Sequence, residues 1–102
     1  MAETLTSFVP QRITLGTSNL ATQVILPRDC NKVTICFEGA IGKYSTTGTD
    51  GVAIDSTDHV LVPAGAFLEV DINRRSHGFP ADIFLASATG STVVMVAPEV
   101  QS

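Results

Sequence analysis

Apolar and polar residues alternate along several short stretches of the chain, and this period of two predicts β-strands. The clearest stretch runs from Lys32 to Glu38, where Val33, Ile35 and Phe37 share one parity and the other parity is mostly polar. Because successive side chains of a strand project to opposite faces, we expect this strand to be half-buried. No window of about eleven residues keeps apolar positions at helical spacing. The pattern therefore predicts an all-β protein.

Further strand-like stretches follow one another closely and are separated by Gly, Pro, Asn and Asp. The expected strands cover residues 5–9, 12–15, 20–26, 32–38, 52–54, 59–62, 66–72, 83–86 and 92–97, with 39–51 as a turn-rich segment and 73–80 as a polar loop. The two most apolar strands, 83–86 and 92–97, are expected in central positions, covered on both faces. Seven to nine short strands in one domain predict an antiparallel β-sandwich or jelly roll.

Composition supports a single folded β domain. Twelve Thr and eleven Val favour strands, because both side chains lose χ1 freedom in a helix. The 44% hydrophobic and 16% charged residues exclude disorder by composition. A net charge of −4 with six basic residues argues against a nucleic-acid groove. The apolar runs are too short to span a membrane, and the start MAETLTSF predicts no secretory signal.

The N-terminal segment is predicted to lie at the margin of the domain. We expect residues 1–19 to form an arm or edge strand and residues 20–102 to form the β-sandwich, because Pro10 cannot donate to a central ladder. The apolar side chains of Leu5, Phe8 and Val9 are candidates for contact with a neighbouring subunit or partner. An aromatic anchor contributes most to such contacts, so Phe8 leads this set. The alternative is an ordinary first strand of the same sheet.

Arg74 and Arg75, close to His77, form the basic cluster of the chain. They are candidates for contact with an acidic partner surface or a phosphate, and the alternative is a solvated hairpin loop. Ser76, His77 and Asp82 do not predict a catalytic triad, since no nucleophile elbow precedes them and adjacent residues project apart on a strand. We therefore expect no enzymatic activity.

The two cysteines, Cys30 and Cys36, are predicted to be reduced thiols. A turn followed by a strand would hold their Cα atoms beyond the roughly 7 Å that a disulfide allows. A zinc site would need further ligands at suitable spacing, and His59 and His77 do not supply them.

The acidic and glycine-rich stretches of the chain do not predict ligand sites. Asp50, Asp55 and Asp58 lack the spacing and terminal Glu of an EF-hand loop, so we expect solvated acids. Residues 39–45 lack the spacing of a phosphate-binding loop, in which a hydroxyl follows the Lys directly. No cofactor and no metal are expected.

Several motifs resemble those of small virion proteins of tailed bacteriophages. They are ATQVILP at 21–27, KVTI at 32–35, GKY at 42–44, TGTDG at 47–51 and IFLASATGSTVV at 83–94. The resemblance covers about residues 20–97 and implies a non-enzymatic capsid component, often a decoration (cement) protein. Such a protein binds the outer surface of the major capsid protein lattice and stabilises the head, frequently as a homotrimer. The resemblance implies a virion protein that assembles in the host cytoplasm, without nucleic-acid or membrane partners.

Two other classes of function stay open at this point. A carbohydrate-binding β-sandwich usually stacks a sugar on an exposed aromatic, and this chain has no Trp and a single Tyr, Tyr44. A Ca²⁺-assisted sugar site would need only carboxylates. Another virion part, such as a neck, tail or head-fibre protein, would carry similar strand and turn motifs.

Overall fold

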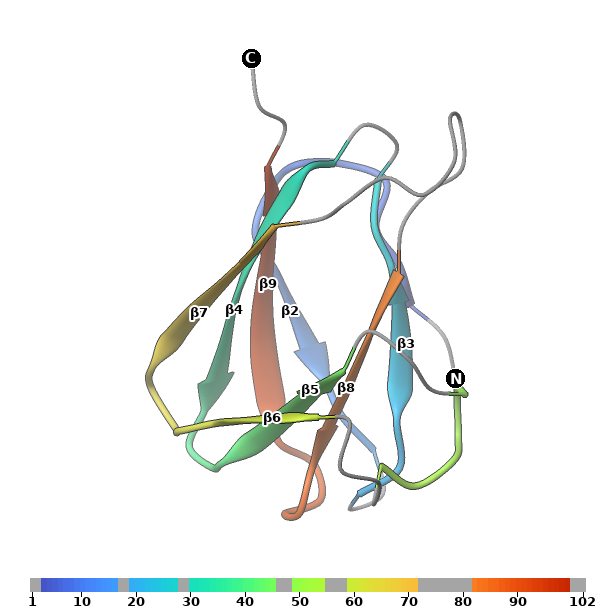
Figure 1. Cartoon of the computed structure of the whole chain (residues 1–102), viewed down its shortest axis with the longest axis vertical. Helices are drawn as coiled ribbons and strands as arrows, with labels where there is room; N and C mark the ends of the chain where they lie inside the picture. Colours follow the sequence, from blue (N-terminus) through green and yellow to red (C-terminus); the bar gives the residue numbers. More distant parts are fainter. Residues whose placement is uncertain are drawn as a thin grey trace.

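The computed structural model describes residues 3–16, 19–27, 30–45, 49–54, 59–71 and 82–99. Across these ranges the chain forms strands and no helix, which confirms the all-β prediction (Figure 1). The strands are β1 (Glu3–Thr4), β2 (Gln11–Thr14), β3 (Thr22–Ile25), β4 (Lys32–Glu38), β5 (Gly42–Ser45), β6 (Val60–Val62), β7 (Phe67–Asp71), β8 (Asp82–Ser87) and β9 (Val93–Glu99). None of the described residues belongs to a helix capable of crossing a membrane.

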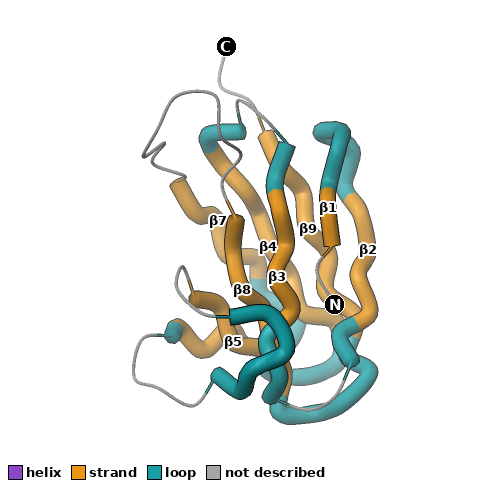
Figure 2. The backbone as a smooth tube through the Cα atoms, turned by 90° about the vertical axis from the view of Figure 1, so that its right-hand side faces the viewer, coloured by secondary structure: helices purple, strands orange, loops and turns teal. Residues whose placement is uncertain are grey.

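The strands form two sheets that pack face to face, as the two views in Figures 1 and 2 show. A five-stranded sheet has the order β1-β3-β8-β5-β6, and a four-stranded sheet has the order β2-β9-β4-β7. Between the named strands, β1 and β3 pair in parallel and the other pairs are antiparallel. The predicted antiparallel β-sandwich is therefore confirmed.

The connectivity is that of a long hairpin rolled up on itself. Starting from its tip, β5 pairs with β6, β4 with β7, β3 with β8 and β2 with β9, each pair antiparallel. Rolling this ribbon brings β4 beside β9 and β5 beside β8, which completes the two sheets. Nested pairs distributed over two packed sheets define the jelly roll, the second form of the predicted fold.

The core lies between the two sheets, and the alternate residues that the sequence predicts to be buried point into it. Val33, Ile35 and Phe37 of β4 are each fully buried, as expected from the alternation. On β7, Leu68 and Val70 pack against the core, whereas Phe67 points outward. β8 and β9 each have a strand on both sides, so their predicted central positions are confirmed. Only β8 is buried on both faces, because alternate residues of β9 are partly exposed.

The expected strand at 5–9 does not form, since the strand of this segment is β1 (Glu3–Thr4), and one further strand was not expected. β5 lies within the segment that was expected to be turn-rich, because glycine usually interrupts a strand. At Gly42 the glycine serves packing instead: a Cβ there would overlap the ring of Phe37. Conversely, the expected strand at 52–54 contributes only an isolated bridge between Leu20 and Ala53.

A second, smaller core lies on the outer face of the five-stranded sheet. Phe84 and Ala86 point away from the main core, yet they are 6% and 0% exposed. They form a cluster with Ala21 and Ile54, because residues 49–54 lie against this face of the sheet. Consecutive residues of β8 are therefore buried because the main core lies on one face of its sheet and the segment 49–54 lies on the other.

Candidate interaction surfaces

Residues 3–16 give an end strand to each sheet, β1 to one and β2 to the other. Leu5 follows β1 and donates its backbone N–H to the carbonyl of Ile25 at 2.8 Å. Its side chain is 3% exposed and belongs to the main core, as does that of Ile13. Leu5, expected on a contact surface, therefore stabilises its own domain and is not available to a partner.

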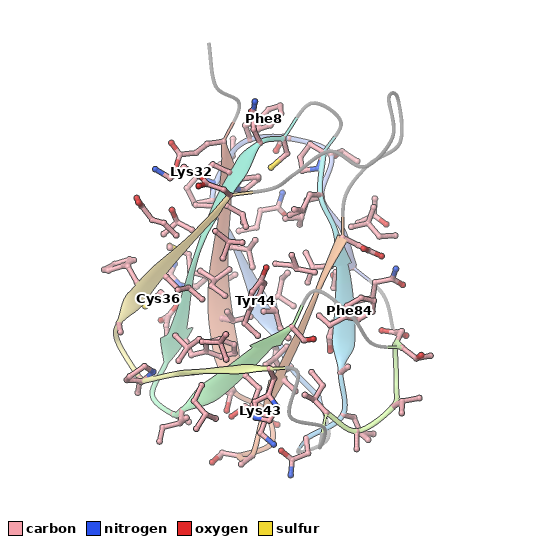
Figure 3. The ribbon with its side chains drawn as sticks, in the orientation of Figure 1. Phe8, Lys32, Cys36, Lys43, Tyr44 and Phe84 are labelled. Atoms are coloured by element: carbon pink, nitrogen blue, oxygen red, sulfur yellow. The ribbon has the colours of Figure 1, made fainter. Side chains whose placement is uncertain are left out.

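Phe8 and Val9 lie on the surface, in the connection between β1 and β2. They are 39% and 63% exposed. Figure 3 places Phe8 at the same end of the sandwich as Lys32, the first residue of β4. Both ends of this connection are fixed by pairing, since β1 pairs with β3 and β2 with β9. The sandwich thus presents an aromatic side chain from a connection held at both ends.

The other sequence candidates, Arg74 and Arg75, lie outside the described residues, and so do Asp55, Asp58 and His77. The described residues contain no group of three or more His, Cys, Asp or Glu side chains placed to hold a metal ion. Asp50 is described, and its role is structural.

The outward face of the four-stranded sheet carries a row of side chains that crosses all four strands. The register places Phe67, Cys36, Met95 and Arg12 side by side on β7, β4, β9 and β2. Phe67 is the most exposed of its large hydrophobic residues, at 70%. Phe67 alternates with Leu68 and Val70, which pack against the core, so its side chain points outward and stays largely exposed.

Two ion pairs flank this row. The Arg12 guanidinium Nε donates to Glu38 Oε2 at 2.7 Å, and Lys32 Nζ lies 3.2 Å from Glu69 Oε1. Both pairs are solvent-exposed, so each contributes little to stability. Their effect is to surround the apolar centre of the sheet with charge.

A third exposed apolar surface lies at the free edge of the five-stranded sheet. We call the outer margin of β6 (Val60–Val62) the β6 edge. Val60 and Leu61 are 51% and 60% exposed, and Ile41, just before β5, is 58% exposed. The sequence of β6 does not predict whether the strand is central or at an edge, and only the tertiary structure identifies it as an end strand.

Side-chain contacts from Lys43 and Asp50 hold the outer segment 49–54, in addition to its backbone hydrogen bonds with residues 19–21. Lys43 Nζ donates to Asn19 Oδ1 at 2.9 Å and to the carbonyl of Ile54 at 3.0 Å. The backbone N–H of Gln23 donates to Asp50 Oδ1 at 2.9 Å, which lowers the pKa of the Asp50 carboxyl below its ordinary value. Asp50 thus ties its segment to β3, where the sequence had suggested a solvated acid.

Both cysteines are free and buried, which confirms the prediction of reduced thiols. The Cys30 thiol donates to the carbonyl of Lys32 at 3.3 Å, and burial raises its pKa. Tyr44, the one tyrosine, is only 6% exposed and belongs to the core cluster. Its ring face is therefore not available for stacking on a sugar.

Comparisons of the chain with protein-family models, with curated proteins and with solved structures found no match.

Proposed function

We propose that this protein is a non-enzymatic decoration protein of a tailed-phage virion, which binds the outer surface of the major capsid protein lattice and stabilises the head. Two features support the proposal. The strand and turn motifs resemble those of small virion proteins, and the rolled-hairpin topology is one that viral capsid domains use. Lectin domains use the same topology, so the fold by itself does not assign the function.

The observation that carries the proposal is the presentation of Phe8 and Val9. An exposed aromatic beside an exposed aliphatic residue is a typical anchor for a protein partner. The connection that carries them is held by the buried Leu5 on one side and the buried Ile13 on the other. Because little backbone freedom is left to lose, docking these side chains on a capsid surface costs little ordering entropy.

On the shell, we propose that the copies gather in threes around threefold positions of the capsid lattice, as the resemblance implies. A domain of 102 residues buries only a modest fraction of its surface, so it gains stability from a shell that covers more of it. The net charge of −4 suits a protein that binds protein in preference to nucleic acid.

The test is binding of the purified protein to undecorated shells of the major capsid protein from the same virus. Wild type is expected to co-sediment with the shells and to raise their melting temperature. Phe8→Asp should weaken binding at least about tenfold, the loss typical of a hot-spot residue. Val52→Asp is the matched control, because Val52 is 54% exposed on a different segment. Absence of binding by wild type, or equal binding by folded Phe8→Asp, contradicts the proposal.

Carbohydrate binding is the second candidate, and Phe67 is the feature that favours it. Its ring is 70% exposed on an outward sheet face, next to the carboxylate of Glu69 two residues along the same strand. A flat aromatic beside a hydrogen-bond acceptor suits a sugar ring. Glycan binding detected by titration calorimetry and abolished by Phe67→Ala, with shell binding absent, would favour this function over the first.

A further inference from the structure

The four end strands of the sandwich differ in charge. β1 contains Glu3, β2 contains Arg12, and β7 contains Glu69 and Asp71. Charged residues on an end strand oppose its pairing with another chain, and proteins use them widely for this purpose. β6 (Val60–Val62) carries no charge and is the unprotected edge of the described sandwich.

Two of the three side chains of β6, those of Val60 and Leu61, are exposed as well as uncharged, whereas Val62 is buried in the main core. Leu61 is 60% exposed, and it lies opposite Lys43 on the outer face of the sheet. Val60 lies on the other face of the sheet, where it is 51% exposed, and its paired residue on β5 is the buried Tyr44. The edge therefore offers unpaired backbone groups together with apolar side chains on both faces, which is what an added strand requires.

We propose that the β6 edge is a self-association site, at which β6 of a second copy of this chain pairs antiparallel with it about a twofold axis through Leu61. The sequence Val-Leu-Val reads the same in both directions. In this arrangement Leu61 faces Leu61 of the second copy, and Val60 faces Val62. A twofold contact needs such a self-complementary surface.

Charge favours β6 over the other edges for contact between identical chains. Each copy has a net charge of −4, so contact between copies is least opposed at a surface that adds no close pairs of like charges. Pairing of β7 with itself would bring the acids Glu69 and Asp71 of the two copies together, and pairing of β2 would do the same for Arg12. Like charges across paired strands are destabilising.

Lys43, which lies opposite Leu61 on β5, does not oppose the contact. The two Lys43 residues would be separated by three strand spacings, about 14 Å, which exceeds the Debye length of about 8 Å at physiological salt. Each ammonium is also held on its own subunit by Asn19 and the carbonyl of Ile54.

The contact is small, since β6 has three residues. Interfaces below about 1,200 Å² give weak complexes, so we expect a reversible dimer that forms at high protein concentration. The two five-stranded sheets would then form one continuous sheet across the dimer.

A disulfide trap tests the register of the contact. Residues directly opposite each other in an antiparallel pair have Cα atoms about 4.5–5.5 Å apart, within the range for a disulfide. Leu61→Cys should therefore form a covalent dimer under mild oxidation, seen on a non-reducing gel. Val60→Cys is the matched control, because Val60 of one copy lies diagonal to Val60 of the other at about 7–8 Å. Native Cys30 and Cys36 are buried and should not interfere.

Sedimentation equilibrium gives the second readout. Wild type is expected to approach twice its 10.7 kDa as its concentration rises towards about 1 mM. Leu61→Lys should stay monomeric at the same concentration, whereas Val52→Lys, an exposed loop control, should behave like wild type. Equal cross-linking of Leu61→Cys and Val60→Cys, a wild type that stays monomeric, or an assembly that Leu61→Lys does not change would overturn the proposal. None of these results bears on shell binding through Phe8.

Discussion

Gly42 shows how one position can depend on a side chain of another strand. The glycine lies in β5 and its missing side chain leaves the space that the ring of Phe37 fills. Phe37 is fully buried and is among the largest side chains of the core, so the ring has no other place to go. The glycine is therefore a packing residue, and its backbone freedom is secondary.

Substitution of Gly42 tests this packing. Gly42→Ala should lower the free energy of unfolding by about 1–3 kcal/mol, because the added methyl group forces the Phe37 ring or the strand to move. Gly16→Ala is the control, since nothing lies within 4 Å of a Cβ at that position. Denaturant unfolding of both variants measures the difference. Equal midpoints would show that the Phe37 ring moves aside without cost.

Cys30 makes stability depend on alkaline pH. Burial raises the pKa of its thiol above the ordinary value of 9.0, so the folded state retains the proton more firmly than the unfolded state. This contribution is fully present below pH 9.0 and is lost as the pH rises through the pKa of the folded protein.

The corresponding prediction compares wild type with Cys30→Ala. Between pH 7 and pH 11, wild type should lose more stability than the variant, because the variant has no thiol to ionise. Thermal unfolding across this range measures both curves, and the difference between them removes the effect of other titrating groups. Parallel curves would mean that the Cys30 thiol ionises as easily in the folded state as in the unfolded state.

At the scale of elements, the segment 49–54 converts the outer face of a sheet into a second packed layer. Its backbone pairs with residues 19–21, and Ile54 covers Phe84 and Ala86. Lys43 joins the two parts, because its ammonium donates to Asn19 and to the carbonyl of Ile54. The lysine thus acts as a polar clamp on an otherwise apolar cover.

Removing the clamp should loosen this cover. Lys43→Met is expected to cost about 1–3 kcal/mol, the range for hydrogen bonds that involve a charged group. Arg12→Met is the control, because its ion pair with Glu38 is exposed and should change stability by less than about 1 kcal/mol. Chemical denaturation gives both values, and amide hydrogen exchange at Ile54 should speed up in Lys43→Met alone. Unchanged exchange there would show that the apolar contacts hold the segment by themselves.

At the scale of the whole molecule, the nested hairpin places distant parts of the chain beside each other. Gln11 near one end of the chain pairs with Val96 near the other, and β4 contacts both β7 and β9. Only the tip pair, β5 with β6, joins strands that are consecutive within the hairpin. Most of the structure therefore forms through long-range pairing.

This topology predicts slow folding. Proteins dominated by distant strand pairs fold in about milliseconds to seconds, because loop closure costs entropy before the contacts form. Stopped-flow refolding from denaturant should give rates in this range. Ile13 lies in the outermost pair of the hairpin, which we expect to close last, so Ile13→Val should mainly speed unfolding. Refolding within microseconds would be inconsistent with a rolled hairpin.

The sequence by itself determined the class of the fold and the direction of many side chains. Alternation is a local property, and it correctly assigned the buried parity of β4. The apolar character of residues 83–86 and 92–97 correctly placed β8 and β9 inside their sheets. The abundance of Thr and Val and the lack of helical periodicity correctly predicted strands throughout.

Only the tertiary structure decided which surfaces are covered. Residues 39–51 were expected to be turn-rich, and the strand position of Gly42 within them depends on packing against the Phe37 ring of another strand. Leu5 and Phe8 have the same apolar character in the sequence, yet β1 pairing carries Leu5 into the core while Phe8 stays exposed. In the same way, the residues of β6 do not predict that this strand lies at the edge of its sheet. Burial and edge position depend on which strands meet after the hairpin has rolled up, and a local pattern does not contain that information.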